Sequence, residues 1–434
     1  MKNKLRFYNA MVLTAPNAAP FWGELHVEGG KILYVGKGEN APLFEAEREI
    51  DCERNLLMSG FCNAHAHAAM SLFRGIADDY TLEDWLYDCI FPLEKNLTAE
   101  DVYWGTMLQI AEFVRNGITC FADMYFFPES VVSAAKNANM GLALCCPSSS
   151  MSGGNILGEM ERNYYLYSSM SDRIRYFIGL HAEYTCEESL LAGVADLAAE
   201  TGSKTYIHLS ETLKEVGDCT VRHGGLTPPQ YLHKLGFFDN GGLAAHCVYV
   251  DKDDMELLRQ SGVTPVVNCG SNLKLGSGIA PVASMLRLGM HPALGTDGTA
   301  SNNASSMFRE MYLYSCLQKQ ALKDASVVSA EEALRAATCD GYAALGLSGG
   351  KLENGTAADV ILIDLRAVNL QPISDVCKNL VYSGNASNVV MTVCGGKIVY
   401  EKGTFSIGET LDKIFDECNR RQRRLMRQAE IKHR

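Results

Sequence analysis

The chain has 434 residues, 47% of them hydrophobic, and a formal net charge of −12 without a long basic tract, which argues against nucleic-acid and anionic-membrane partners. No apolar stretch reaches the roughly 18 residues that span a membrane, and the N-terminus lacks the apolar core of a signal peptide. The fifteen cysteines are odd in number and have no C-x-x-C spacing, which indicates reduced thiols and a cytoplasmic protein.

The N-terminal residues are predicted to form short strands without intervening helices. Residues 5–13 form one expected strand, and residues 24–28 and 31–35 flank Gly29-Gly30 in a hairpin. Residues 1–58 are therefore assigned to the N-terminal part of a β domain. His26 lies in the hairpin and is expected to be a surface histidine.

From Gly60 to about Gly346, apolar runs alternate with helical segments. The run at 56–58 is expected to lead into one buried strand that ends in His-x-His. An aromatic-rich insertion and a helix capped by Thr98 follow. Further strands are expected at residues 117–124, 141–147, 175–181, 204–211, 242–246, 263–268 and 291–297. Eight strands alternating with helices are typical of an α/β protein with a (β/α)8 TIM-type barrel, assigned to residues 59–348.

After Gly349 the β pattern returns. Residues 358–364 are predicted to form a strand, and residues 389–394 and 397–400 to form a second hairpin. We expect the two chain ends to pair into one small β domain that flanks the barrel, with residues 349–404 as its C-terminal part. Residues 405–434 are expected to form a C-terminal helix, whose basic run at 420–424 is interpreted as a solvated face.

Histidines and an aspartate lie at the ends of the predicted strands, where a barrel places its active site. His65 and His67 point the same way because side chains alternate along a strand. His65, His67 and His208 supply neutral nitrogens, and Asp297 supplies an anionic oxygen. This ligand set suits one divalent ion per chain, with zinc expected and Fe²⁺ or Mn²⁺ as alternatives.

Three residues are candidates for the chemistry. A divalent metal lowers the pKa of bound water from about 15.7 toward about 7, and Asp297 can take the proton as the water attacks. Glu211, three residues after His208, can carry a proton to the leaving group. His246 can stabilise the developing charge by hydrogen bonding. The remaining histidines are interpreted as surface or structural: His223, His233, His291 and His433.

Several motifs together resemble a known family. Residues 65–67, 208–211, 245–247 and 295–298 resemble the metal-dependent deaminase branch of the amidohydrolase superfamily. Residues 73–79, 85–86, 92–94, 271–281 and 296–303 resemble the 5-methylthioadenosine/S-adenosylhomocysteine deaminase family, over essentially the whole chain. The resemblance implies hydrolytic deamination of an adenine nucleoside, such as 5′-methylthioadenosine, 5′-deoxyadenosine, adenosine or S-adenosylhomocysteine, to its inosine analogue and ammonia.

The same resemblance implies residue roles. The metal ligands would be His65, His67, His208 and Asp297. Glu94 would hydrogen-bond the ribose hydroxyls, although a carboxylate at a helix start is the simpler interpretation from composition. His181 would contact the purine ring, and Glu211 and Asp297 would contact its reacting edge. Trp85 would pack near the nucleoside, or it would only pack in the hydrophobic core.

The chain also departs from the family. Members that accept S-adenosylhomocysteine carry arginines after the third strand, whereas residues 147–162 contain only Arg162, and Glu159 falls where one arginine would be. The first histidine pair reads His-Ala-His where His-Thr-His is common, which leaves the ligands intact.

Two other functions are compatible with parts of this pattern. A guanine-type deaminase, pterin deaminase or s-triazine hydrolase would share the superfamily, but Glu94 favours a substrate with a ribose. A non-catalytic metal-binding scaffold is disfavoured because Glu211 and His246 accompany a complete ligand set. The expected partner is a small-molecule nucleoside, and assembly into a homo-oligomer is left open.

Overall fold

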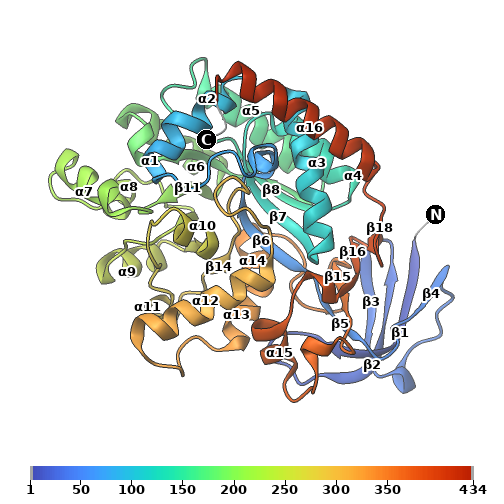
Figure 1. The fold of residues 1–434 in the computed structure, drawn as a ribbon. Helices are drawn as coiled ribbons and strands as arrows, with labels where there is room; N and C mark the ends of the chain where they lie inside the picture. Colours follow the sequence, from blue (N-terminus) through green and yellow to red (C-terminus); the bar gives the residue numbers. More distant parts are fainter. Residues whose placement is uncertain (1–2, 432–434) are drawn as a thin grey trace.

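A computed structural model describes residues 3–431 and contains two regions with different strand pairing (Figure 1). The middle of the chain carries parallel strands that alternate with helices. Both chain ends contribute strands to one mixed, largely antiparallel sheet, which lies beside the middle region in Figure 1. The predicted α/β class is confirmed.

The strands of the middle region pair into two parallel sheets, in the orders β6-β7-β8-β9 and β10-β11-β12-β13-β14. Each run predicted from the sequence is a strand, and the run 175–181 is divided between two. The bounds are β6 (Phe61–Ala66), β7 (Ile118–Met124), β8 (Gly141–Cys145), β9 (Ile174–Tyr176), β10 (Ile178–Ala182), β11 (Thr205–Leu209), β12 (Gly242–His246), β13 (Val263–Val267) and β14 (Ala293–Leu294).

Backbone hydrogen bonds connect the edges of these two sheets. Phe177, which lies between β9 and β10, donates its N–H to the Leu144 carbonyl of β8 at 2.9 Å. At the other edge, the N–H groups of Thr296 and Asp297, just after β14, donate to the His65 carbonyl of β6 at 3.1 and 3.0 Å. That the two sheets close into one barrel stays a prediction.

Helices follow the strands and lie around them (Figure 1). Thr98 caps α3 by a reciprocal bond pair with Asp101, as the sequence predicted. The bounds are η2 (Ala68–Phe73), α3 (Ala99–Arg115), α4 (Pro128–Asn137), α5 (Ile156–Ser168), η4 (Glu183–Thr185), α6 (Glu188–Thr201), α7 (Leu213–Arg222), α8 (Pro228–Lys234), α9 (Lys252–Gln260), α10 (Cys269–Lys274), α11 (Val282–Arg287), α12 (Met307–Leu322), α13 (Ala330–Ala336) and α14 (Cys339–Leu345).

The insertion between η2 and α3 folds into successive helical segments, α1 (Leu82–Asp84), the π-helical turn η3 (Trp85–Ile90) and α2 (Phe91–Glu94). Ile90 and Leu93 are fully buried, so these segments pack an apolar face onto the core. π-helical turns are rare and occur frequently at functional sites. The insertion therefore has a fixed apolar base that can carry polar groups toward a site.

The sheet made by the chain ends contains β1 to β5 and β15 to β18. β5 pairs with β1 and also with β15, which joins the two ends. Treating this sheet as a separate domain stays a prediction. The bounds are β1 (Lys4–Leu13), β2 (Phe21–Glu28), β3 (Lys31–Gly36), η1 (Gly38–Asn40), β4 (Arg48–Asp51), β5 (Leu56–Ser59), β15 (Val360–Ile363), η5 (Val368–Leu370), α15 (Val376–Ser383), η6 (Ala386–Asn388), β16 (Val389–Cys394), β17 (Lys397–Glu401) and β18 (Thr404–Phe405).

Two local predictions in the N-terminal part were wrong. The run 56–58 does not continue into the His-x-His strand, because β5 ends before Gly60 and belongs to the other sheet. A Cβ at Gly60 would lie 2.2 Å from Thr119 Oγ1, so the chain passes tightly against β7 there. His26 is buried rather than at the surface, since its Nε2 pairs with Glu24 Oε1 at 2.9 Å and its ring stacks on Phe44.

The C-terminal helix α16 (Leu411–Gln428) lies across α3 (Figure 1). Interpreting its basic run as a solvated face was wrong for Arg421, which is 6% exposed and donates from Nη1 to Asp101 Oδ1 at 3.1 Å. Arg424 also bonds the same buried carboxylate, which draws both arginines inward. His433 lies outside the described residues. Among the helices of residues 3–431, none combines the length and apolarity needed to cross a membrane.

Candidate active site

The four predicted metal ligands meet at the C-terminal ends of the parallel strands. His65 is the penultimate residue of β6, His67 follows this strand, His208 lies on β11 and Asp297 follows β14. Asp297 Oδ1 lies 3.4 Å from His65 Nε2 and 3.2 Å from His67 Nε2. The Nε2 atoms of His67 and His208 are 3.3 Å apart. Parallel strand pairing thus brings together residues that are far apart in the sequence.

Hydrogen bonds to backbone carbonyls orient two of these rings. His67 Nδ1 donates to the Met124 carbonyl at 2.7 Å, and His208 Nδ1 donates to the His181 carbonyl at 2.7 Å. A carbonyl only accepts, so both rings donate from Nδ1, and in their neutral forms they turn an Nε2 lone pair toward each other. Against the effect of burial, the Asp297 carboxylate raises the pKa of His67 to about 9, so a cation that binds here would displace a proton from His67 Nε2. Such orienting bonds are typical of histidines that coordinate a metal.

The donor atoms fit a divalent cation. In the neutral rings the two facing lone pairs would repel, and the buried His65 Nε2 has no hydrogen-bond partner among residues 3–431. An unsatisfied buried polar group costs about 1–3 kcal/mol. A cation between these nitrogens and Asp297 would satisfy all of them, and three nitrogens with one carboxylate are ligands that zinc accepts.

Asp297 is fixed as an anionic group. Its Oδ2 accepts hydrogen bonds from Ser271 Oγ at 2.6 Å and Ser301 Oγ at 2.9 Å, which leaves Oδ1 facing the histidines. Burial opposes ionisation, but the neighbouring His65 and His67 outweigh it and hold the pKa of Asp297 well below its usual range. Its φ of +60° is unusual for a residue other than glycine, and such strain is often found at functional sites.

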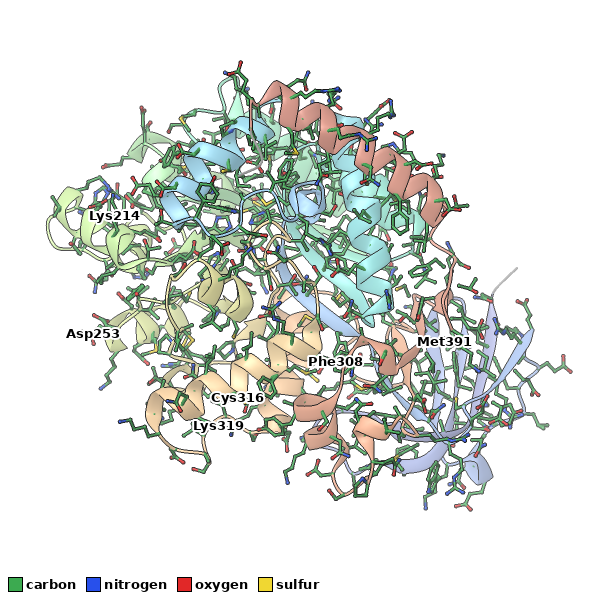
Figure 2. All side chains as sticks on the ribbon, viewed as in Figure 1. Lys214, Asp253, Phe308, Cys316, Lys319 and Met391 are labelled. Carbon is green, nitrogen blue, oxygen red and sulfur yellow. The ribbon has the colours of Figure 1, made fainter. Side chains whose placement is uncertain are left out.

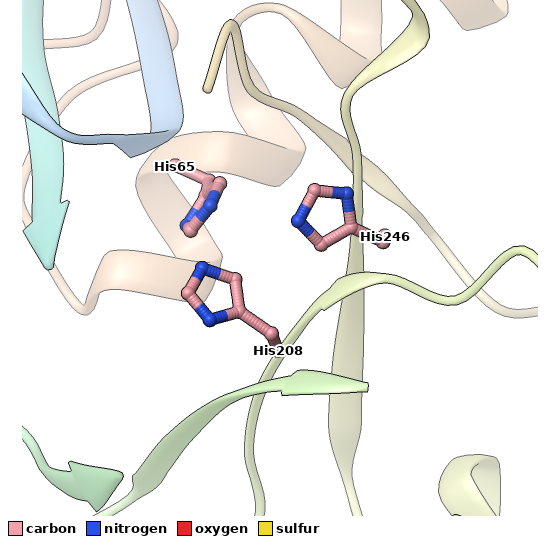
Figure 3. Close-up of side chains that lie close together, drawn as sticks. All are labelled: His65, His208 and His246. Carbon is pink, nitrogen blue, oxygen red and sulfur yellow. The ribbon is translucent and has the colours of Figure 1, made fainter. Parts of the chain in front are cut away.

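His246 faces the same centre but is turned differently. Asn272 Nδ2 donates to His246 Nδ1 at 2.9 Å, so Nδ1 accepts and the ring proton lies on Nε2. Figure 3 shows the other ring nitrogen of His246 facing His65 and His208. His65, His208 and His246 each have a potential ligand atom within 4.8 Å of those of the other two. The same is true of the group formed by His65, His67 and Asp297.

Glu211 lies beside His246. Its Oε1 is 3.7 Å from His246 Nδ1, accepts from Ser277 Oγ at 2.9 Å and lies 3.5 Å from Asn272 Nδ2. Burial raises the pKa of Glu211. Glu215 accepts the Glu211 backbone N–H at 2.7 Å, which fixes the turn after β11. The Glu211 carboxylate is therefore held at one side of the centre.

A cavity of about 960 Å³ opens over these groups. The residues predicted for metal, catalysis and substrate all line it except His65, which is buried: Trp85, Glu94, His67, His181, His208, Glu211, His246 and Asp297. The structure thus brings the predicted substrate-binding residues to the same cavity as the predicted ligands.

The insertion supplies two of these lining residues. Burial raises the pKa of Glu94 to about 7, against the effect of Tyr125 and His67. Trp85 is almost wholly buried, and its Nε1 has no hydrogen-bond partner among the described residues. Trp85 combines core packing with contact to the cavity, so the two roles expected for Trp85 are compatible.

His181 lies on β10 with its ring centroid 4.9 Å from that of His208. Burial lowers the pKa of His181 to about 4, so the ring is neutral near pH 7. Its Nδ1 lies 3.3 Å from Thr185 Oγ1. A neutral imidazole in this place can exchange hydrogen bonds with a heterocycle.

Sequence reasoning missed the polar groups that orient the predicted residues. Tyr206 hydrogen-bonds His65 Nδ1, and its position two residues before His208 on one strand was a usable signal, because such residues share a face. Ser271, Asn272, Ser277 and Ser301 lie within motifs already quoted for the family resemblance, but nothing in one sequence reveals which partner each contacts.

The segment that departs from the family also lines the cavity. Glu159 and Arg162 of α5 both reach it, as does Glu129 of α4. All three are exposed. The outer part of the cavity therefore carries two carboxylates and a guanidinium.

His223 is structural, as expected from the sequence. Its Nε2 lies 2.8 Å from Glu183 Oε1, and its ring stacks on Tyr231 at 3.5 Å between centroids. Arg222 also bonds Glu183, at 2.6 Å. Glu183, Cys219 and His223 have potential ligand atoms close together, but the arginine already neutralises the carboxylate.

Comparison with known proteins identifies the family. The model of the amidohydrolase family matches residues 56–399. A 5-methylthioadenosine/S-adenosylhomocysteine deaminase from Caldanaerobacter subterraneus subsp. tengcongensis is 39% identical over 410 residues, which cover 93% of this chain and 94% of the relative.

Solved structures agree with this similarity. An adenosine deaminase from Xanthomonas campestris with bound zinc has a TM-score of 0.91 and 29% identity, and the match covers 98% of each chain. An atrazine chlorohydrolase from Arthrobacter aurescens complexed with zinc has a TM-score of 0.87 at 20% identity, with 96% of this chain and 100% of that chain covered, which supports the fold alone. The chain belongs to the amidohydrolase family and, within it, to the family of 5-methylthioadenosine/S-adenosylhomocysteine deaminases.

Proposed function

We propose that the protein is a metal-dependent hydrolytic deaminase that converts a 5′-substituted adenine nucleoside to the inosine analogue and ammonia. The observation that carries the proposal is the convergence of three imidazoles and Asp297 at the floor of a cavity that Glu94 also lines. The names of the relatives at 39% identity support this substrate class.

We infer that β6 to β14 close into one eight-stranded barrel in which β9 and β10 act as a single strand. The backbone bonds at both sheet edges support closure. In this view the chain-end sheet is a flanking domain formed by residues 1–58 and 349–404, and residues 59–348 form the barrel.

His65, His67, His208 and Asp297 would hold the metal, with zinc first and Fe²⁺ or Mn²⁺ as alternatives. The carbonyl bonds of two rings and the two serine bonds to Asp297 support this assignment. When bound, a divalent cation here supplies a water molecule acidified enough to act as a nucleophile near neutral pH. Asp297 would accept a proton at Oδ1, the oxygen that faces the two histidines.

Glu211 and His246 would handle the proton and the charge. Replacing the purine amino group by oxygen requires a proton to reach the departing nitrogen. Glu211 is held by Ser277 beside the centre, so its carboxyl group can deliver that proton. His246 directs an N–H toward the centre because its Nδ1 accepts from Asn272, and this N–H can stabilise negative charge on the attacked ring.

Glu94, His181 and Trp85 would bind the substrate. A carboxylate accepts hydrogen bonds from two vicinal hydroxyls, which suits the ribose for Glu94. His181 offers a neutral ring to the purine, and Trp85 supplies apolar packing. A triazine or free base has no ribose, so the placement of Glu94 on the cavity favours a nucleoside.

We also propose that the protein works in the cytoplasm. All fifteen cysteines are free, which supports a reducing cytoplasm. A homo-oligomer stays a prediction.

Ammonia release tests the function. The zinc-loaded protein would be assayed with 5′-methylthioadenosine, 5′-deoxyadenosine, adenosine, S-adenosylhomocysteine, guanine, a pterin and an s-triazine. We expect turnover of adenine nucleosides and none of the free bases. Turnover of guanine, pterin or triazine without any adenine nucleoside would replace the proposal with the corresponding hydrolase.

A further inference from the structure

Three segments that are distant in the sequence meet at a polar cluster of Asp78, Lys274 and Asn303, called here the 78–274–303 cluster. Lys274 Nζ contacts Asp78 Oδ1 and Asn303 Oδ1. Asn303 Nδ2 lies 3.2 Å from Asp78 Oδ1 and 3.1 Å from Asp78 Oδ2. Each of the three side chains therefore contacts both of the others.

Each member adjoins a different part of the active site. Asp78 lies near the start of the insertion, Lys274 is the last residue of α10, and Asn303 lies in the loop after β14. The insertion carries Trp85 and Glu94, α10 carries Ser271 and Asn272, and the loop carries Asp297 and Ser301. The cluster is thus a junction between the substrate-binding and the chemical parts of the site.

The other two members are fixed independently of Asp78. The loop after β14 is tied to α3, because Glu112 Oε1 accepts the Ser305 N–H at 3.0 Å and Gln109 Nε2 donates to Ser305 Oγ at 2.8 Å. In α10, Ser271 bonds Asp297 at 2.6 Å. Asp78 therefore attaches the start of the insertion to a frame that is already rigid.

The cluster fixes the position of the insertion more than it adds to the stability of the fold. The Lys274 and Asp78 side chains remain 25% and 35% exposed. Partly exposed ion pairs contribute only about 0–1 kcal/mol. Three mutual contacts nevertheless restrict the position of residue 78 more tightly than a single pair, and Asn303 is held at a φ of +64° that its surroundings must maintain.

We infer that the 78–274–303 cluster is a latch that holds the insertion over the cavity, and that Asp78 and Lys274 are positioning residues for nucleoside binding by Glu94 and Trp85. The inference rests on the proposed function. Ile90 and Leu93 anchor the far part of the insertion in the core. Releasing the latch therefore loosens the start of the insertion without unfolding it, and weakens binding more than chemistry.

The test uses Asp78→Asn, Lys274→Met and the double variant in the zinc-loaded full chain. For 5′-methylthioadenosine we expect KM to rise about five-fold, equivalent to about 1 kcal/mol, with kcat within about two-fold and zinc content unchanged. The double variant should match the worse single variant, since both remove one interaction. Lys274→Arg should keep most of the wild-type KM.

A matched control is Glu256→Gln, which breaks the 2.6 Å pair between Glu256 and Arg259 on α9. Figure 2 shows Asp253 of this helix at the outer edge of the molecule, away from the insertion. This control should change neither KM nor kcat. An equal KM increase in the control and the latch variants would overturn the inference.

Limited digestion with chymotrypsin tests the latch without activity. Tyr87 lies in η3 and is 54% exposed. Initial cleavage after Tyr87, identified by mass, should be about five-fold faster in Asp78→Asn and Lys274→Met than in wild type or Glu256→Gln. If the wild-type protein deaminates no adenine nucleoside, the proposed function fails, and this measurement still decides the latch. The latch would be overturned if Asp78→Asn and Lys274→Met were cleaved at the wild-type rate and had the wild-type KM. It would also be overturned if these variants lost zinc and kcat while KM stayed constant.

Discussion

The floor of the cavity and its mouth are held by different kinds of contact. The floor consists of His65, His67, His208 and Asp297, which lie at or just after the ends of strands whose pairing is fixed by backbone hydrogen bonds. The mouth consists of the insertion between η2 and α3 and the exposed ends of α4 and α5. Its position depends on side-chain packing and on partly exposed polar contacts. This difference separates a part that fixes the chemistry from a part that adjusts substrate choice.

The floor and the mouth also differ in the hydrogen bonds and ion pairs that fix their polar side chains. Each floor residue has a partner that fixes its orientation: Tyr206, the Met124 carbonyl, the His181 carbonyl, or the two serines on Asp297. At the mouth, Glu159 and Arg162 form no ion pair with any residue of the described range. We therefore expect all-or-none effects at the floor and graded effects at the mouth.

The largest effect is expected from removing a ligand. Asp297→Ala and His65→Ala should each lose the bound metal and activity, because the remaining donors cannot complete the site. Metal analysis and ammonia release check this, and chelation of the wild-type protein followed by zinc addition should remove and restore activity. A full metal content in both variants would contradict the assignment of the floor.

A second substitution tests whether chemistry can be lost while the floor stays intact. Glu211→Gln should keep the metal, because Glu211 contacts Ser277 and Asn272 rather than the ligand atoms. Its kcat should fall by at least about 10²-fold, a typical contribution of general acid–base catalysis. Near wild-type turnover with metal present would remove Glu211 from the proton path.

At the mouth, Glu94→Ala should mainly weaken substrate binding. A charge-assisted hydrogen bond contributes about 1.5–3 kcal/mol, so its loss should lower kcat/KM for adenosine about 10- to 150-fold. Glu129→Ala is the matched control, because this exposed carboxylate also lines the cavity. Equal losses in both variants would mean that Glu94 has no specific role in binding the ribose.

The floor was more predictable from the sequence than the mouth. Histidines at the ends of apolar runs predicted where His65, His208 and His246 would lie, because parallel strands end at one edge. The break at Gly60 was not predictable, since the approach of Thr119 that requires it comes from another strand. The ion pair between Asp101 and Arg421 was not predictable for the same reason, because Arg421 lies on the C-terminal helix, far from Asp101 in the sequence.

The smallest expected effect concerns the substituent at the 5′ position. The carboxylate of S-adenosylhomocysteine would meet Glu159 and Glu129 as well as Arg162 in the outer cavity. Unlike a site with paired arginines, this lining offers one guanidinium against two like charges. We expect kcat/KM for S-adenosylhomocysteine to be roughly 10-fold below that for 5′-methylthioadenosine, a difference of about 1.4 kcal/mol.

Two variants sharpen this last comparison. Glu159→Gln should narrow the gap between the two substrates by removing repulsion, without changing kcat/KM for 5′-methylthioadenosine, which carries no charge to respond. Arg162→Ala should widen the gap if its guanidinium receives the carboxylate. S-adenosylhomocysteine as the best substrate of the wild-type protein would show instead that the single arginine of the mouth outweighs both carboxylates, and that the mouth selects for charge where we expect it to select against it.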